Sequence, residues 1–264
     1  MNLNLNALQE AVLRGELGAD PASVSATGAV SIYQTTQFPG SAVKYRNHYL
    51  LLRVGEAFGA CSHTPGQLSA DAAEECSGRS VAELLRDDRL PVRVAAMDAY
   101  LAAVRPHHGA CREVAHIPAG TPLDKALLRD ACVADTARIA PGSRVALIGV
   151  VNPLIEAIER RGGICLPCDL QLERTQSGQR VEPDMHVVLE QADSVICTGM
   201  TLSNGSFDLI VHKVREREIP LTVYAQTGSA IAARFVGEGV RSVVAEPFPF
   251  TQFSGGASEL FIYH

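Results

Sequence analysis

The sequence contains no tryptophan, only 5% aromatic residues and no apolar run of membrane-spanning length. A membrane helix needs about 20 consecutive apolar residues, whereas the longest candidate run, Val145–Val151, has the length of a strand. The first 18 residues also lack the basic start and the continuous apolar segment of a signal peptide. We therefore expect a soluble cytoplasmic protein with no membrane partner.

Positive charge is also scarce, which bears on nucleic-acid binding. The formal net charge is −6; residues 1–120 carry 10 basic and 12 acidic side chains, and residues 121–264 carry 13 and 17. Domains that bind DNA or RNA concentrate positive charge on one face. Since neither half is basic, we expect no nucleic-acid partner.

The seven cysteines are odd in number and scattered, which is not the pattern of a disulfide framework. Most of them lie in apolar runs, which favours reduced, buried thiols. Cys165 and Cys168 have CxxC spacing, which can bind zinc or cycle a disulfide, but zinc needs a second pair of ligands. Cys165 lies within a predicted strand, whereas Cys168 and Asp169 lie at its carboxyl end, where a ligand could meet them.

The first part of the chain has the pattern of an α+β unit. Ala29–Gln37 and Ala57–Ser62 are predicted strands, and Ala42–Val54 is expected to form two short strands with a turn near Arg46-Asn47. Strands so closely spaced indicate an antiparallel meander. A helix with a stripe of small residues follows at Pro91–Val104, and residues 106–118 resemble a linker.

After a helix that Thr121 can cap, strands and helices alternate to the end of the chain. The predicted strands are Arg144–Gly149, Gly163–Pro167, Ser194–Thr198, Leu221–Ala225 and Ser242–Ala245. Such alternation predicts an α/β fold with a parallel sheet covered by helices. These sheets bind ligands beyond the carboxyl ends of their strands, where the strand order switches.

The loop Thr198–Ser206 carries the densest polar chemistry, with two glycines, four hydroxyl residues and one amide. It follows an apolar strand and enters a helix, whose first backbone N–H groups can bind an anion. Two interpretations stay open. Thr198, Gly199, Thr201 and Asn204 could bind a carboxylate or phosphate, or the loop could be a capped turn with Asn204 or Ser206 as the cap. Three residues of other loops complete the candidate ligand set: Asn152, Thr227 and Ser254.

The segment Gly149-Val-Val-Asn-Pro153 stands where a dinucleotide-binding protein would have its glycine-rich fingerprint. It contains one glycine, and the two valines would hinder the close approach of a pyrophosphate. The chain also lacks a GxxxxGK[ST] phosphate loop. We therefore expect neither an NAD(P) cofactor nor an ATPase function.

His63 could supply an imidazole to the same cleft, because it ends a predicted strand before Thr64-Pro65. With Cys168 and Asp169 it gives a mixed set of hard and soft donors, which suits zinc, iron, nickel or copper better than magnesium. The alternative interpretation is a buried Cys61 beside a histidine at the rim of the first domain. The segment Phe248–Ser258 could fold over the site as a lid or serve as a packing tail.

Several of these segments together resemble a bacterial and archaeal family known as putative heavy-metal-chelation proteins. The sharpest match is the motif TG-x-T-L-x-N-G-[ST] at residues 198–206. Cys61–Pro65, Gly78–Leu84 and Arg144–Pro153 resemble further family segments, whereas the loops at 168–170 and 225–229 depart from the family pattern. The resemblance implies an enolase N-terminal-like domain at residues 1–108 followed by a Rossmann-like domain at residues 109–264.

We therefore expect a protein that binds a small anionic metabolite or a metal chelate in the cleft between the two domains. A role in metal homeostasis or metallophore metabolism fits this expectation. The alternative is an enzyme, a lyase or synthase of small-metabolite biosynthesis, that uses the same cleft. A transition metal ion is a possible cofactor, and alanine-rich helices such as Pro91–Val104 also occur in homodimer interfaces.

The incomplete fingerprint at residues 149–153 makes the first testable prediction. NAD and NADP should not bind tightly, because the second and third glycines that admit the pyrophosphate are missing. Calorimetric titration of the purified protein with both cofactors measures this, and a micromolar dissociation constant for either one would contradict it.

Overall fold

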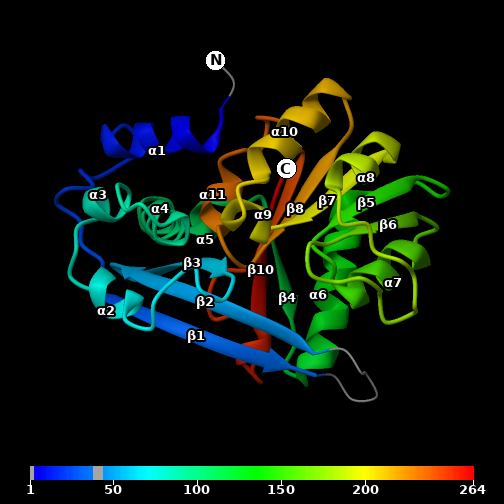
Figure 1. Ribbon diagram of the computed structural model, residues 1–264, viewed down its shortest axis with the longest axis horizontal. Helices are drawn as coiled ribbons and strands as arrows, with labels where there is room; N and C mark the ends of the chain where they lie inside the picture. Colours follow the sequence, from blue (N-terminus) through cyan, green and yellow to red (C-terminus); the bar gives the residue numbers. More distant parts are fainter. Residues whose placement is uncertain (1–2, 38–43) are drawn as a thin grey trace.

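The computed structural model describes residues 3–37 and 44–264. A three-stranded sheet is built by the amino-terminal part and a seven-stranded sheet by the remainder (Figure 1). Within these ranges no helix is long and apolar enough to cross a bilayer. The predicted mixed α/β fold with a largely parallel sheet is confirmed.

The small sheet is an antiparallel meander of three strands: β1 (Gly28–Thr36), β2 (Tyr45–Val54) and β3 (Ala57–His63). The predicted turn near Arg46-Asn47 is wrong, because both residues lie inside β2, opposite Thr35 and Gln34 of β1. Polar residues in this stretch reflect a strand with one polar face, since successive side chains point to opposite sides of a sheet.

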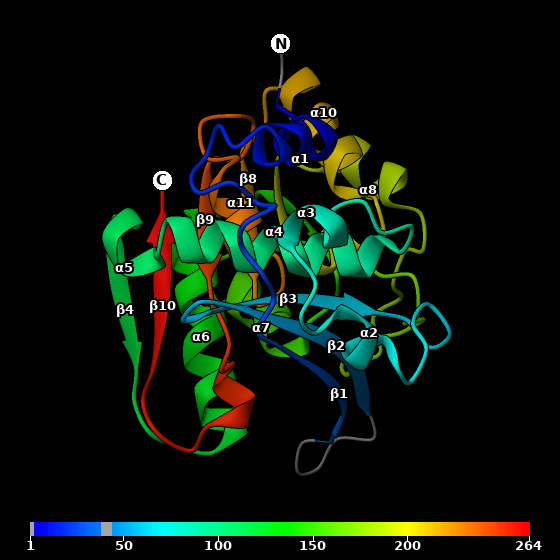
Figure 2. The ribbon, with the colours of Figure 1, turned by 90° about the vertical axis from the view of Figure 1, so that its left-hand side faces the viewer.

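The helix α4 (Leu90–Val104) lies across β2 and β3 and buries the other face of the small sheet (Figure 2). The predicted small-residue stripe allows this close approach. A Cβ on Gly59 of β3 would collide with the backbone of Ala99, so only glycine fits at this crossing. Leu50 and Leu52 of β2 are fully buried beneath the same helix layer.

Three short helices precede α4: α1 (Leu5–Leu13), α2 (Ala72–Cys76) and α3 (Val81–Leu84). A capping box starts α3, with Ser80 and Glu83 bonded reciprocally. Thr121 caps α6 (Pro122–Ala137) in the same way, with Asp124 as its partner. Local capping chemistry therefore sets both of these helix starts.

The large sheet has the strand order β4-β10-β9-β8-β7-β5-β6. Its parallel strands are β5 (Arg144–Ile148), β6 (Ile164–Cys168), β7 (Ser194–Thr198), β8 (Leu221–Ala225) and β9 (Ser242–Ala245). The predicted alternation of strands and helices is thus confirmed. The helices α6 and α7 (Asn152–Arg160) pack on one face of the sheet. The other face carries α8 (Met185–Gln191), α10 (Phe207–Glu216) and α11 (Ser229–Ala233), with the short α9 (Met200–Ser203) leading into α10.

Two antiparallel strands extend this sheet beyond the prediction. β4 (Glu113–Ile117), which follows α5 (His107–Ala110), lies within the stretch interpreted as a linker, and β10 (Ser258–Tyr263) inserts between β4 and β9. The segment before β10 contains a short 3-10 helix at Thr251–Phe253. The buried ammonium of Lys125 holds this segment by donating to Ser254 O, Gly256 O and Ser258 Oγ, each at 2.7 Å.

The strand order has a switch at β5, because β6 lies on one side of β5 and β7 on the other. The connections that follow β5 and β7 therefore run in opposite directions. A crevice lies between the carboxyl ends of these two strands. The β1–β2 hairpin of the small sheet reaches toward α6 at this end of the large sheet (Figure 1). The fold thus brings the polar face of the hairpin to the switch point.

Asp98 of α4 joins the two parts of the fold at a fully buried position. Its carboxylate accepts hydrogen bonds from Ala60 N of β3 at 2.9 Å and from Ala230 N of α11 at 2.8 Å. Burial raises the pKa of Asp98 to about 7, although these backbone donors act in the opposite direction. One carboxyl group therefore connects both sheets and titrates near neutrality.

The raised pKa of Asp98 makes stability depend on pH. Between pH 4 and pH 7 the unfolded carboxyl has released its proton while the folded one keeps it, so the free energy of unfolding should fall as pH rises. Above pH 7 this dependence should level off. Urea unfolding of the wild type and of Asp98→Asn at several pH values measures it, and equal pH slopes in both proteins would contradict the assignment.

Candidate functional site

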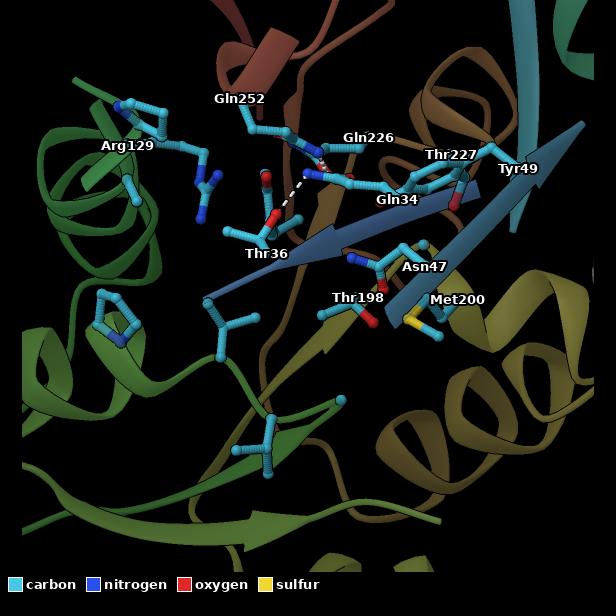
Figure 3. A pocket seen from close by; sticks show the side chains of 18 of the residues that line it. Gln34, Thr36, Asn47, Tyr49, Arg129, Thr198, Met200, Gln226, Thr227 and Gln252 are labelled. Carbon is cyan, nitrogen blue, oxygen red and sulfur yellow. Dashed lines mark hydrogen bonds between the residues drawn. The ribbon is translucent and has the colours of Figure 1, made fainter. Parts of the chain in front are cut away.

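A cavity of about 160 Å³ lies at the switch point, between the small sheet, α6 and the carboxyl ends of the large sheet. Side chains from all three surround it, among them Thr36, Asn47 and Thr198 (Figure 3). Polar and apolar residues share the lining, and few of the polar ones are charged. The polar residues are Gln34, Thr36, Asn47, Tyr49, Arg129, Asp169, Thr198, Tyr224, Gln226, Thr227 and Gln252.

Thr198 and Gly149 form the wall of the cavity that lies on the switch point itself. Gly149 has φ of +90°, and a Cβ there would collide with Thr198 Oγ1. Thr198 is 7% exposed, and its Oγ1 has no hydrogen-bond partner among the described residues. A buried hydroxyl without a partner is costly, so this atom is positioned for a ligand or a water molecule.

Gly199 and Thr227 of the predicted set also line the cavity. A Cβ on Gly199 would collide with Thr227 O, so the loops after β7 and β8 touch here and need glycine. Thr201 and Asn204, by contrast, do not line it. The Thr201 hydroxyl donates to Thr198 O at 2.8 Å, and Asn204 Oδ1 accepts from Ser206 N at 3.0 Å in a local turn before α10.

Asn152 and Ser254 lie outside this cavity as well. Asn152 is buried, and its Oδ1 accepts a hydrogen bond from Gln176 N at 2.8 Å, which holds the loop before α8. Ser254 O is one of the acceptors of the Lys125 ammonium. Both residues therefore have structural contacts that their positions in the sequence did not indicate.

The three expected metal ligands do not form a shared site. His63 lies opposite His48 in the β2–β3 pairing, whereas the neighbours of His48, Asn47 and Tyr49, line the cavity. Because adjacent strand residues face opposite sides, His63 points away from the cavity. Its Nδ1 lies 3.1 Å from Thr64 O.

Cys168 also turns away, into the hydrophobic core beneath α8. Cys165 packs in the core on the opposite face of the sheet, so the CxxC pair cannot act together. Burial raises the pKa of each thiol to about 12, which keeps both protonated at neutral pH. Nowhere in the described ranges do three or more His, Cys, Asp or Glu residues form a group that could hold a metal ion.

Asp169 does line the cavity, but it is engaged with the backbone. Its Oδ2 accepts from Val150 N at 3.0 Å and its Oδ1 from Gln171 N at 2.8 Å. These bonds fix the loops after β5 and β6 around the carboxylate. Each oxygen retains a lone pair that can accept from a ligand.

Arg129 of α6 was not predicted as a site residue, yet it is the cationic side chain in the cavity wall. Its Nε donates to Asp130 Oδ1 at 2.7 Å and its Nη1 to Thr251 Oγ1 at 3.3 Å, and the guanidinium lies 5.1 Å from the centre of the Tyr224 ring. Burial acts to lower its pKa, but the charges of Asp130 and its neighbours raise it, so the group stays cationic. In sequence, adjacent Arg and Asp residues within a helix resemble an ordinary solvated face.

A buried network continues from Arg129 through Glu246. The Glu246 carboxylate is 1% exposed and accepts from Tyr224 OH at 2.7 Å, from Gln226 Nε2 at 3.0 Å and from Thr251 N. Gln226 and Gln252 exchange amide hydrogen bonds at 2.7 and 3.2 Å. The segment interpreted as a lid or packing tail thus supplies Gln252 to the wall of the cavity.

Comparisons with known proteins support the fold and point to one family. Residues 132–222 match the model of the DUF364 family, described as "Putative heavy-metal chelation". A DUF364 protein of unknown function from Desulfitobacterium hafniense DCB-2 is 13% identical, with a TM-score of 0.63 over 98% of this chain and 100% of that chain. Another from Pyrococcus horikoshii is 13% identical, with a TM-score of 0.55 over 97% and 98%. Curated proteins give no significant match.

The contact between Gly149 and Thr198 makes a prediction about stability. Gly149→Ala places a Cβ against Thr198 at a positive φ, and we expect it to lower the free energy of unfolding. Gly178→Ala is the matched control, because Gly178 has φ of +87° with nothing within 4 Å of its Cβ position. Urea unfolding should show about 1–3 kcal/mol more destabilisation at Gly149, as for an overpacked core. Equal losses of unfolding free energy in the two variants would mean that backbone strain at a positive φ explains them, without a contact to Thr198.

Proposed function

We propose that this protein binds a small anionic metabolite or a metal chelate in the cavity at the switch point. The observation that carries the proposal is the buried, unpartnered hydroxyl of Thr198, which faces a space that Gly149 leaves open. Arg129 supplies positive charge from α6 to the same cavity. A volume of about 160 Å³ is below the roughly 300–1,000 Å³ of pockets for drug-sized ligands, which favours a small metabolite.

We also propose the division suggested by the sequence resemblance. Residues 1–108 would form the enolase N-terminal-like domain, and residues 109–264 the Rossmann-like domain. The antiparallel meander followed by helices supports the first assignment, and the parallel strands with a switch at β5 support the second. The ligand would then lie between the domains, as the lining from β1, β2 and β8 suggests.

The residues of the cavity do not fit a resident metal ion. Among the described residues that line it, Asp169 is the sole carboxylate, and none is a histidine or a cysteine. Transition metals are held in proteins by several such donors. The family description of heavy-metal chelation is consistent with a different arrangement, in which a metal arrives already held by its chelator and the protein binds the chelator's anionic groups.

Replacing the cavity cation tests this proposal. Phosphate, oxalate, citrate and the nickel–citrate complex serve as probes, and at least one should raise the melting temperature of the wild type. Arg129→Met should weaken binding of that probe about tenfold or more, because a hydrogen bond to a charged group contributes about 1.5–3 kcal/mol. Thr198→Val should also weaken it without lowering stability, since the hydroxyl that it removes has no described partner.

Arg160→Met is the matched control, because Arg160 is exposed in a surface ion pair with Glu156. Calorimetry should give the control the affinity of the wild type. Failure of all four probes and of amino acids to bind, or equal affinity in Arg129→Met and the control, would overturn the proposed site.

A further inference from the structure

We infer that the ligand of this cavity is zwitterionic, with a carboxylate beside an ammonium group as in an α-amino acid. The inference rests on the proposed function: it keeps an anionic carboxylate on the ligand at Arg129 and adds a positively charged group beside it. It comes from the polar atoms that the cavity leaves without partners, which must match the ligand in both charge and hydrogen-bonding direction.

Arg129 defines where the carboxylate lies. Its Nε and Nη1 are occupied by Asp130 and Thr251, and Tyr224 lies against one face of the guanidinium. Nη2 forms no hydrogen bond within the part of the chain that the structure describes. In Figure 3 the guanidinium extends from α6 toward the space beside Thr36. An arginine that is 8% exposed and held on two sides presents one fixed donor edge, which suits a carboxylate oxygen.

Gln34 requires a hydrogen-bond donor on the ligand, whereas Arg129 requires an acceptor. Its Nε2 donates to Thr36 Oγ1 at 2.7 Å, whereas its buried Oε1 has no partner among the residues described. A carbonyl oxygen only accepts hydrogen bonds. A ligand that satisfies Gln34 must therefore carry an N–H or O–H donor, which a fully ionised carboxylate, oxalate for example, cannot supply.

Asp169 favours a positive charge on the hydrogen-bond donor of the ligand. Its carboxylate lies in the wall of the same cavity, and its two oxygens are bonded to backbone N–H groups rather than to a cationic side chain. An ammonium group on the ligand can use the remaining lone pairs. Arg129 and Asp169 both line this cavity of about 160 Å³.

The charges around Arg129 also favour a zwitterionic ligand. Arg129 is already paired with Asp130, and Glu246 is close enough to raise its pKa. The buried surroundings are therefore not strongly positive. A ligand with no net charge enters them at lower electrostatic cost than a dianion.

Matched pairs of small acids test the inference. The probes are glycine with acetate, L-alanine with propionate, L-aspartate with succinate, and L-glutamate with glutarate, with L-lactate and L-malate as the hydroxy counterparts. Calorimetry or ligand-observed NMR should show that at least one amino acid binds the wild type about tenfold or more tightly than its plain and hydroxy partners.

Two variants locate this preference in the cavity. Gln34→Met removes the acceptor and Asp169→Asn removes the negative charge, and each should reduce the preference for the amino acid at least threefold. Gln67→Met is the control, because Gln67 is exposed and its Oε1 is bonded to Thr64 N outside the cavity. It should keep the full preference.

The outcomes separate this inference from the proposed function. If plain or hydroxy acids bind as tightly as the amino acids and lose affinity in Arg129→Met, the ligand is not zwitterionic. The same result would support the proposed anion site. A preference that survives both cavity variants would also overturn it. No binding by any probe would count against both.

Discussion

One buried carboxylate bridges the parts of this protein that carry its two sheets. Asp98 lies on the helix that covers the small sheet, yet one of its hydrogen-bond donors belongs to α11 of the large sheet. Backbone N–H groups left unpaired at such depth would be costly. The two hydrogen bonds therefore hold β3 and α11 at a fixed distance from α4. The cavity depends on that distance, because part of its wall comes from β1 and β2 and the rest from α6 and the loops of the large sheet.

The hairpin β1–β2 contributes to folding and to the candidate site through its two faces. Leu50 and Leu52 are buried with α4 in the core, whereas Asn47 and Tyr49, at odd-numbered positions of the same strand, line the cavity. Strand geometry makes this separation unavoidable, since neighbouring side chains point in opposite directions. The same alternation explains why His63 cannot join the site. A shift of one residue in the pairing would exchange the two faces completely.

Local patterns in the sequence were sufficient for most of the large sheet. The period of the apolar residues, the Thr121 cap and the glycine-rich turn after β7 are each set by neighbours in the chain, so the parallel strands and the placement of Thr198 could be predicted. The pairing of β4 with β10 and the contact of Arg129 with Thr251 could not, because in each case the two partners are more than 100 residues apart in sequence. Polar residues such as Gln34 give no signal of their own, since only tertiary packing distinguishes a cavity wall from a solvated strand.

The position of β10 has a consequence for how the chain is made. β4 and β9 are separated by β10 in the sheet, although both precede it in the chain. Until residues 258–263 are available to pair, β9 has an open edge and β4 has no strand partner among the described residues. Such edges are templates for pairing with other chains. The nascent protein therefore passes through an interval of exposure to aggregation that ends when residues 258–263 emerge and close the sheet.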